Sequence, residues 1–351
     1  MKSISYDIDP GGDIELILKK PNKQNIVPKI RPWKDFKNSK TLNSPCLGRY
    51  EVFSELYPGE DDQNKTAEEV EVHMRVSSHH LQFASLTFRA MLQGPWIEAA
   101  PSSQSIRPIS TEGWDAFALA IVLDCIHGRH FEIPTEITPG LLTRISTIVD
   151  YYQCREAVQV HYRTWADDIV CGLADLESLE DQMIIMWLFV SWVFHDEIRF
   201  GKMAGIFLHS SSGISQFATH DLPVSGILGK LDGMRQPLLK KVSEALADLQ
   251  RELTDEEGCE EHGDSSCSVI LLGILMRVRR RTTDLVAPFE GCNLDEILGD
   301  IKYMDDLVSQ HHQPNKYKRK LPQCTIQGRL GPVLEEIEEV IKGVRLADFK
   351  S

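Results

Sequence analysis

The chain has 351 residues, more than one hydrophobic core usually serves, so we expect two domains. Its hydrophobic fraction of 42% and charged fraction of 26% are those of globular proteins, which argues against wholesale disorder. The 52 acidic residues outnumber the 38 basic ones and give a formal charge of -14. Because an acidic surface repels phosphate backbones, we do not expect the chain to bind nucleic acid.

The amino terminus lacks the apolar stretch of a secretory signal, so we expect an intracellular protein, in the cytoplasm or the nucleus. Thiols are reduced there, and the eight cysteines are not interpreted as a disulfide framework. The most apolar run, 183–194, is too short for a membrane span, which needs about 20 residues. We interpret it as a buried helix in the core of the second domain. Two basic runs, 277–281 and 316–320, are either nuclear import signals or solvated charges.

The first half of the chain contains the strand signals. A short run at 13–18 predicts a strand, entered through a turn at the glycines of 10–12. Residues 19–68 are rich in proline and polar side chains without sustained periodicity, and we expect a long, partly disordered insertion there. At 70–76, apolar and polar residues alternate with period 2, which predicts a half-buried strand.

Helical periodicity begins immediately afterwards. Within 81–92, apolar side chains recur at helical spacing, namely Leu81, Ala84, Phe88 and Met91. A second helix is predicted over 114–125, with Cys125 in the core. A third is predicted over 141–152, with Thr138-Pro139 as its start. Beyond about 168 strand signals nearly vanish, and helical patterns cover 179–194, 238–253, 269–278 and 333–344.

Three groups of residues resemble landmarks of the BTB (POZ-type) domain. Residues 74–92 match the strand-into-helix signature of the family, including its Ala-Ser-x-x-Phe-Arg-Ala-Met core at 84–91. An aromatic-x-Glu element follows as Trp96-Ile97-Glu98, and a late Tyr-Tyr pattern stands at 151–154. The long insertion and the Val-Ser-Ser at 76–78 resemble the fungal branch of the family. The resemblance implies an α+β BTB domain over 1–168, followed by an all-α domain over 169–351.

This resemblance, together with the absence of common nucleotide-binding and hydrolase motifs, predicts a non-enzymatic interaction module without a cofactor. It implies protein partners through two routes. One is self-pairing into a homodimer through a helix face and the exposed edge near the first strand. The other is docking on a cullin-type ubiquitin-ligase scaffold, with Trp96 as anchor and Glu98 as polar contact. Alternatively, Trp96 only caps the core of the domain.

Two other interpretations stay open at this point. The first is an enzyme or ligand-binding protein whose site lies in the helical half, which a deep pocket with convergent charged groups would favour. The second is a zinc site formed by Cys259, Cys267, Cys324 and His312. No Cys-x-x-Cys spacing supports such a site, so unrelated reduced thiols are the simpler interpretation, and we assign no metal-binding residue.

Overall fold

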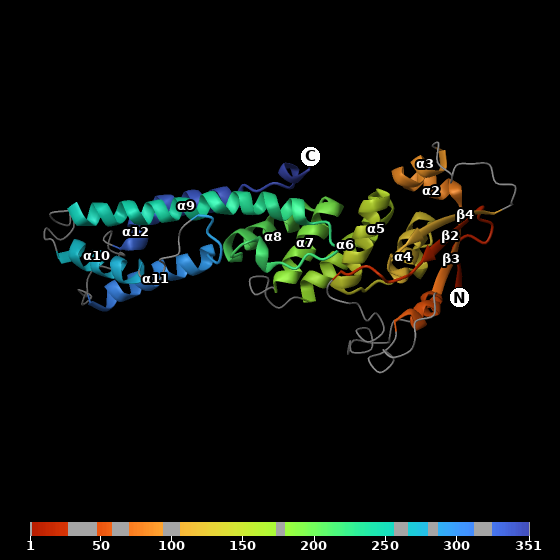
Figure 1. Cartoon of the computed structure of the whole chain (residues 1–351), viewed down its shortest axis with the longest axis horizontal. Coiled ribbons are helices and arrows are strands. Elements are labelled where there is room, and N and C mark those ends of the chain that lie inside the picture. Colours follow the sequence, from red (N-terminus) through yellow and green to blue (C-terminus); the bar gives the residue numbers. More distant parts are fainter. Residues whose placement is uncertain are drawn as a thin grey trace. The chain divides into compact units, whose positions relative to one another are not determined.

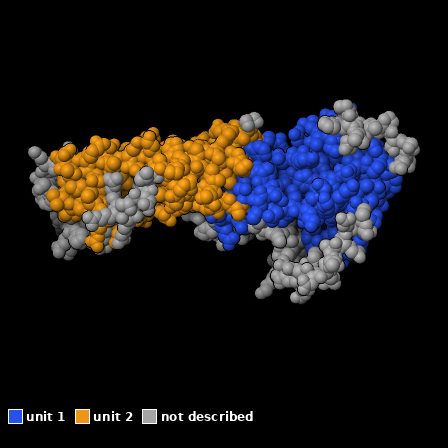
Figure 2. Space-filling model, viewed as in Figure 1, with its two compact units in different colours: residues 1–196, 219–224 blue, residues 197–218, 225–351 orange. Residues whose placement is uncertain are grey.

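The computed structural model describes residues 2–26, 48–57, 70–93, 106–172, 180–255, 266–279, 287–311 and 325–350. The chain forms two compact units (Figure 2). Unit 1 consists of residues 1–196 and 219–224, and unit 2 consists of residues 197–218 and 225–351. The boundary between these units lies after Asp196, and the predicted domain division at 168/169 stays a prediction. Whether either predicted part folds alone as a domain stays a prediction.

Unit 1 contains a mixed four-stranded sheet of order β1-β3-β2-β4. Figure 1 labels β2, β3 and β4 of this sheet. The strands are β1 (Lys2–Asp7), β2 (Ile14–Lys19), β3 (Val70–Val76) and β4 (Arg107–Glu112). The two central strands, β2 and β3, are antiparallel, while β1 runs parallel to β3 and β4 parallel to β2. The predicted strands at 13–18 and 70–76 are confirmed as β2 and β3. The edge strands β1 and β4 were not predicted.

The turn between β1 and β2 requires a glycine because the backbone of β3 lies against it. The amide of Gly12 donates to the Asp9 carbonyl at 2.9 Å. A Cβ atom placed on Gly12 would lie 2.4 Å from the carbonyl oxygen of Val76, closer than any ordinary contact. The predicted turn at 10–12 is therefore confirmed, and at Gly12 the reason is a close backbone approach.

Among the described residues of unit 1, six segments form α-helices, which Figure 1 labels. They are α2 (Ser78–Ala84), α3 (Leu86–Gln93), α4 (Ala116–Ile126), α5 (Pro139–Tyr152), α6 (Arg155–Gly172) and α7 (Asp181–Phe194). Every residue of α4 is buried, including Cys125, as predicted. Thr138 caps α5 by accepting a hydrogen bond from the Leu141 amide, which confirms the predicted start of this helix.

The single helix predicted over 81–92 is wrong, because the chain breaks at Ser85. Ser85 has extended backbone angles, φ −131° and ψ 125°, and separates α2 from α3. Its hydroxyl oxygen accepts from the Phe88 amide at 3.0 Å, the geometry of a helix N-cap. A serine competes well for such a position, since its side chain satisfies a backbone donor that a continuous helix would satisfy otherwise.

Part of the insertion predicted over 19–68 forms a helix that was not predicted. A 3₁₀ helix, η1 (Gly48–Leu56), contacts α4 and β1, and it buries Tyr50 and Phe53 completely. Residues 27–47 and 58–69 lie outside the described part of the chain.

The apolar run 183–194 forms the buried helix α7, as predicted, but its place is different. It packs against α5 and α6 and belongs to unit 1, not to the second compact unit. Ten of its residues are buried, so it is enclosed nearly all round. Among the residues that the structure describes, no helix combines the length and the apolarity that crossing a membrane requires.

In the ranges that the structure describes, unit 2 is a bundle of five α-helices. They are α8 (Glu197–Ser210), α9 (Ser225–Asp255), α10 (Ser266–Arg279), α11 (Leu294–His311) and α12 (Ile326–Lys342). Helix α9 contacts α8, α10 and α12, and α11 contacts α8, α10 and α12. The predicted helices in α9, α10 and α12 are confirmed, whereas α8 and α11 were not predicted. All four described strands end by Glu112, so the expected α+β class, with helices in the second half, is confirmed.

Candidate interaction surface

Helices α2 and α3 expose two large apolar side chains next to their break. Phe83, near the end of α2, is 82% exposed, and Leu86, the first residue of α3, is 57% exposed. We use the name α2–α3 surface for the exposed side chains of His79, His80, Phe83, Leu86, Arg89 and Ala90. Single exposed apolar residues are common on proteins. Here Phe83 and Leu86 lie on either side of the backbone break at Ser85, and the guanidinium of Arg89 is fixed beside this break.

That cation is Arg89 of α3, which crosses the break to the end of α2. Its Nε donates to the Gln82 carbonyl at 2.9 Å, and its Nη2 donates to the Phe83 carbonyl at 3.4 Å. The last carbonyls of a helix carry negative partial charge, so a guanidinium is favourable there. Gln93 adds a second link, because its amide nitrogen donates to the Gln82 side chain at 2.6 Å. The surface is therefore fixed across the break.

The opposite side of α2 and α3 is anchored in the core. Leu81, Phe88 and Leu92 are buried, and the ring of Phe88 stacks on that of Tyr152 with centroids 4.2 Å apart. The hydroxyl of Ser85 donates to the Tyr152 carbonyl, so the break itself is attached to α5. A rigid support of this kind lowers the entropy lost when a partner binds.

His127 attaches the start of α2 to the end of α4. Its Nε2 accepts from the Ser77 amide at 3.0 Å, and its Nδ1 lies 2.7 Å from the Leu123 carbonyl, to which it donates. Both contacts together require the neutral imidazole with its proton on Nδ1. Burial lowers the pKa of His127, which favours this form.

Two buried carboxylates of α4 and its N-cap hold the ordered part of the insertion. Asp124 accepts from the hydroxyls of Tyr6 and Tyr50 at 2.6 and 2.8 Å. Asp115 accepts from the Tyr57 hydroxyl at 2.8 Å. Burial raises the pKa of both carboxyl groups. Because their oxygens bind tyrosine hydroxyls inside the core, these groups fasten η1 and Tyr57 to the fold.

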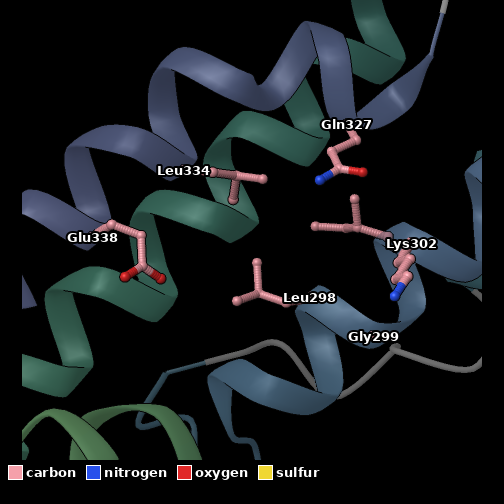
Figure 3. Close-up of a pocket in the computed structure, with 7 residues that line it drawn as sticks. Leu298, Gly299, Lys302, Gln327, Leu334 and Glu338 are labelled. Carbon is pink, nitrogen blue, oxygen red and sulfur yellow. The ribbon is translucent and has the colours of Figure 1, made fainter. Parts of the chain in front are cut away.

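Unit 2 contains a pocket of about 360 Å³ lined by α11 and α12 (Figure 3). Its apolar lining consists of Leu298, Ile301 and Leu334. Lys302 and Glu338 are its charged residues, and the Glu338 carboxylate also lies 3.3 Å from Nε2 of His209.

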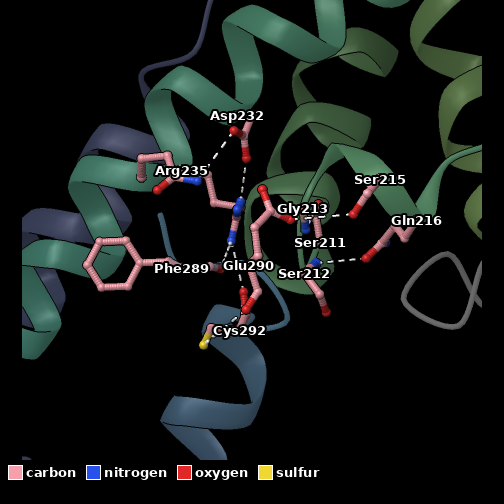
Figure 4. Close-up of polar contacts among 11 residues, drawn as sticks. Ser211, Ser212, Gly213, Ser215, Gln216, Asp232, Arg235, Phe289, Glu290 and Cys292 are labelled. Carbon is pink, nitrogen blue, oxygen red and sulfur yellow. Dashed lines mark hydrogen bonds and ion pairs between the residues drawn. The ribbon is translucent and has the colours of Figure 1, made fainter. Parts of the chain in front are cut away.

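A second polar cluster of unit 2 surrounds the fully buried Arg235 of α9 (Figure 4). Its Nε donates to Asp232 at 2.8 Å, and its Nη1 donates to the carbonyls of Phe289 and Cys292 at 3.3 and 2.8 Å. Since two backbone carbonyls of the 287–293 turn depend on one side chain, Arg235 holds this turn against α9.

The residues predicted for function lie mostly outside the described part of the chain. This applies to Trp96 and Glu98, and also to Cys259, Cys324 and His312 of the zinc hypothesis. Cys267 is buried at the start of α10. Within the described ranges, no group of three or more His, Cys, Asp or Glu side chains is placed to hold a metal ion.

The α2–α3 surface was missed by the sequence argument, which assigned this segment to packing. A signal was present, because a continuous helix with Leu81 and Phe88 inward places Phe83 and Leu86 away from the core. In comparisons with known proteins, no family model, no curated protein and no solved structure matches the chain. The likeness to BTB domains therefore rests on the motif residues alone.

Proposed function

We propose that the chain is a non-enzymatic protein-interaction module of BTB type, acting as an adaptor or self-associating scaffold, and that the α2–α3 surface is its docking surface. The observation that carries this proposal is the exposure of Phe83 and Leu86 on a rigidly anchored helix pair. Burying a side chain of this size contributes about 1.5–3 kcal/mol. Aromatic residues and arginines dominate the binding energy of protein interfaces, and both kinds occur here.

The α2–α3 surface is better suited to self-pairing than the edges of the sheet. The expected homodimer also used the exposed edge near the first strand, and our proposal leaves this edge out. Lys2 of β1 pairs with Glu55 of η1, and Arg49 of η1 donates to the Asp7 carbonyl. The edge near the first strand is thus partly covered. On the other edge, Pro108 of β4 has no amide proton to offer a further strand. Covering and proline are both ways in which proteins prevent edge-to-edge pairing.

If the chain is an adaptor, we propose that the Trp96-Ile97-Glu98 element, which follows α3 in the sequence, also takes part in docking. Helix α3 ends at Gln93, and Trp96-Ile97-Glu98 begins three residues later, so a partner on the α2–α3 surface lies close to this element along the chain. The resemblance to BTB proteins suggests a cullin-type scaffold as that partner. We expect wild type to retain a cullin in a pull-down and the Trp96→Ala, Glu98→Ala variant to lose it.

The self-pairing form is tested with the full chain by light scattering. Phe83→Ser with Leu86→Ser removes the apolar part of the surface without touching the buried anchors. Val160→Ser is the matched control, since Val160 of α6 is 73% exposed and lies in another helix. We expect a dimer for wild type and control, and a monomer for the double variant. A wild type that is monomeric and retains no cullin would contradict both forms.

The pocket of unit 2 supports a second candidate, the binding of a small apolar ligand. Its volume of about 360 Å³ lies in the range of ligand sites, and its lining is mostly apolar with few polar groups. A fluorescent apolar dye, anilinonaphthalene sulfonate, serves as probe. We expect Leu334→Trp, which fills the pocket, to reduce dye fluorescence, and unchanged fluorescence would contradict this candidate.

A further inference from the structure

The charge of the α2–α3 surface differs from that of the chain as a whole. Although the chain carries 52 acidic residues, the 17 residues from 77 to 93 contain no Asp or Glu. The surface presents Arg89, and it adds the exposed imidazoles of His79 and His80. The nearest carboxylate that contacts α2 is Asp13, whose two oxygens accept from the amide and the hydroxyl of Ser78, each at 2.7 Å.

Arg89 has N–H groups left that can donate hydrogen bonds to a carboxylate. A guanidinium has five N–H groups. Two of them donate to the carbonyls of Gln82 and Phe83, and the other three have no partner among the residues that the structure describes. Because the two backbone contacts fix the guanidinium next to Phe83, little side-chain entropy is lost when its remaining fork binds a carboxylate.

We propose that the partner of the α2–α3 surface is an acidic protein segment, whose carboxylate pairs with Arg89 while an apolar side chain packs on Phe83 and Leu86. This inference rests on the adaptor form of the proposed function and names the chemistry of the partner, since self-pairing through this surface would bring two faces without carboxylates together. Charge complementarity selects it, since a basic segment would meet Arg89 with like charge. An anionic membrane offers similar groups, but its extended anionic plane faces the net charge of -14 of the whole chain, whereas a short segment meets the α2–α3 surface alone.

The test begins with a selection that assumes no partner. A random peptide library displayed on phage is selected on the full-length protein, and the enriched peptides are synthesised. We expect them to combine Asp or Glu with large apolar residues. We also expect affinity to fall roughly tenfold or more when the acidic residues are replaced by Asn and Gln, the factor for one charge-assisted hydrogen bond. This comparison requires no protein variant, so it holds even if substitutions at Arg89 disturb the fold.

Variants then locate the binding site. Arg89→Glu should weaken binding by at least the same factor, whereas Arg163→Glu, an equal charge change at an exposed position of α6, should not. Neutral or basic peptides that still require Phe83 and Leu86 would refute the acidic partner and leave the proposed function standing. No enrichment, or binding that is indifferent to Phe83→Ser with Leu86→Ser, would refute both. Arg89-dependent sedimentation with phosphatidylserine vesicles, without peptide enrichment, would replace the protein partner by a membrane.

Discussion

The buried Asp124, with the hydroxyls of Tyr6 and Tyr50 that donate to it, forms the Asp124 cluster. Removing the Tyr50 hydroxyl from this cluster should lower the stability of unit 1 measurably. The substitution Tyr50→Phe keeps the ring, which is fully buried and lies 5.0 Å from that of Phe117, and deletes only the donor to Asp124. A hydrogen bond to a charged group contributes about 1.5–3 kcal/mol. Since each kcal/mol shifts the melting temperature of a unit of this size by about 2–4 °C, we expect a decrease of about 3–12 °C.

The cluster also predicts coupling between two tyrosines. Tyr6 and Tyr50 both donate to Oδ2 of Asp124, while Oδ1 lies 3.8 Å from Nη1 of Arg49. Tyr6→Phe combined with Tyr50→Phe removes both hydroxyl donors from the carboxylate, so the double variant should lose about 3–5 kcal/mol. An interaction energy of about 0.5–3 kcal/mol between the two substitutions is expected for donors that share one acceptor.

Differential scanning calorimetry of the full chain measures these shifts, and hydrogen exchange of the α4 amides identifies the transition that belongs to unit 1. Tyr151→Phe is the matched control, because Tyr151 is 57% exposed and its change should stay within about 0.5 kcal/mol. If Tyr50→Phe and Tyr151→Phe have the same melting temperature, the hydrogen bonds to Asp124 do not stabilise the fold.

Three further expectations follow from other contacts. Since burial lowers the folded-state pKa of His127, the unfolded chain takes up its proton first. Stability should therefore be full above pH 6.5 and fall below it, and urea titrations at pH 7.5 and 5.5 should show a smaller loss for His127→Gln than for wild type. Arg235→Ala removes the hydrogen bonds from this buried guanidinium to Asp232 and to the carbonyls of Phe289 and Cys292, and should cost about 3–5 kcal/mol in urea unfolding. Lys240→Ala, which breaks the exposed pair with Glu244, should cost under about 0.5 kcal/mol, and equal losses would count against the buried cluster. Gly12→Ala must displace the Val76 carbonyl and should lower the melting temperature. Gly229→Ala inside α9, with nothing near its Cβ position, should raise stability by about 0.5–1 kcal/mol. The opposite order of the two melting temperatures would refute the close approach at Gly12.

The elements that sequence reasoning found are those with a strong local pattern. Strand β3 alternates over seven residues, and α5 has both a capping threonine and a continuous apolar face. The edge strand β4 buries only Ile109, so its local signal is weak, and it forms because β2 offers a partner about ninety residues earlier in the chain. Such pairing is a tertiary effect that a window of neighbouring residues does not contain.

The candidate surface was predictable only in part, for a related reason. The predicted face included Ala84 and Met91, yet both are only half-buried, while Ser85 and Leu92 are buried in their place. The break at Ser85 rotates α3 relative to α2, and this break depends on the Tyr152 carbonyl, which a distant segment supplies. The fixed position of Arg89 follows from the same break, because its acceptors are the carbonyls that end α2.

Neither compact unit is a continuous stretch of the gene product. The chain passes from unit 1 to unit 2 after Asp196, returns for residues 219–224, and leaves again. The returning segment is held in unit 1, where Asp221 Oδ2 accepts from the Asn25 amide at 2.7 Å, and Val224 is fully buried. A premature stop codon between 197 and 218 would therefore remove part of unit 1 along with most of unit 2. A fragment that contains all of unit 1 must therefore also carry α8 of unit 2.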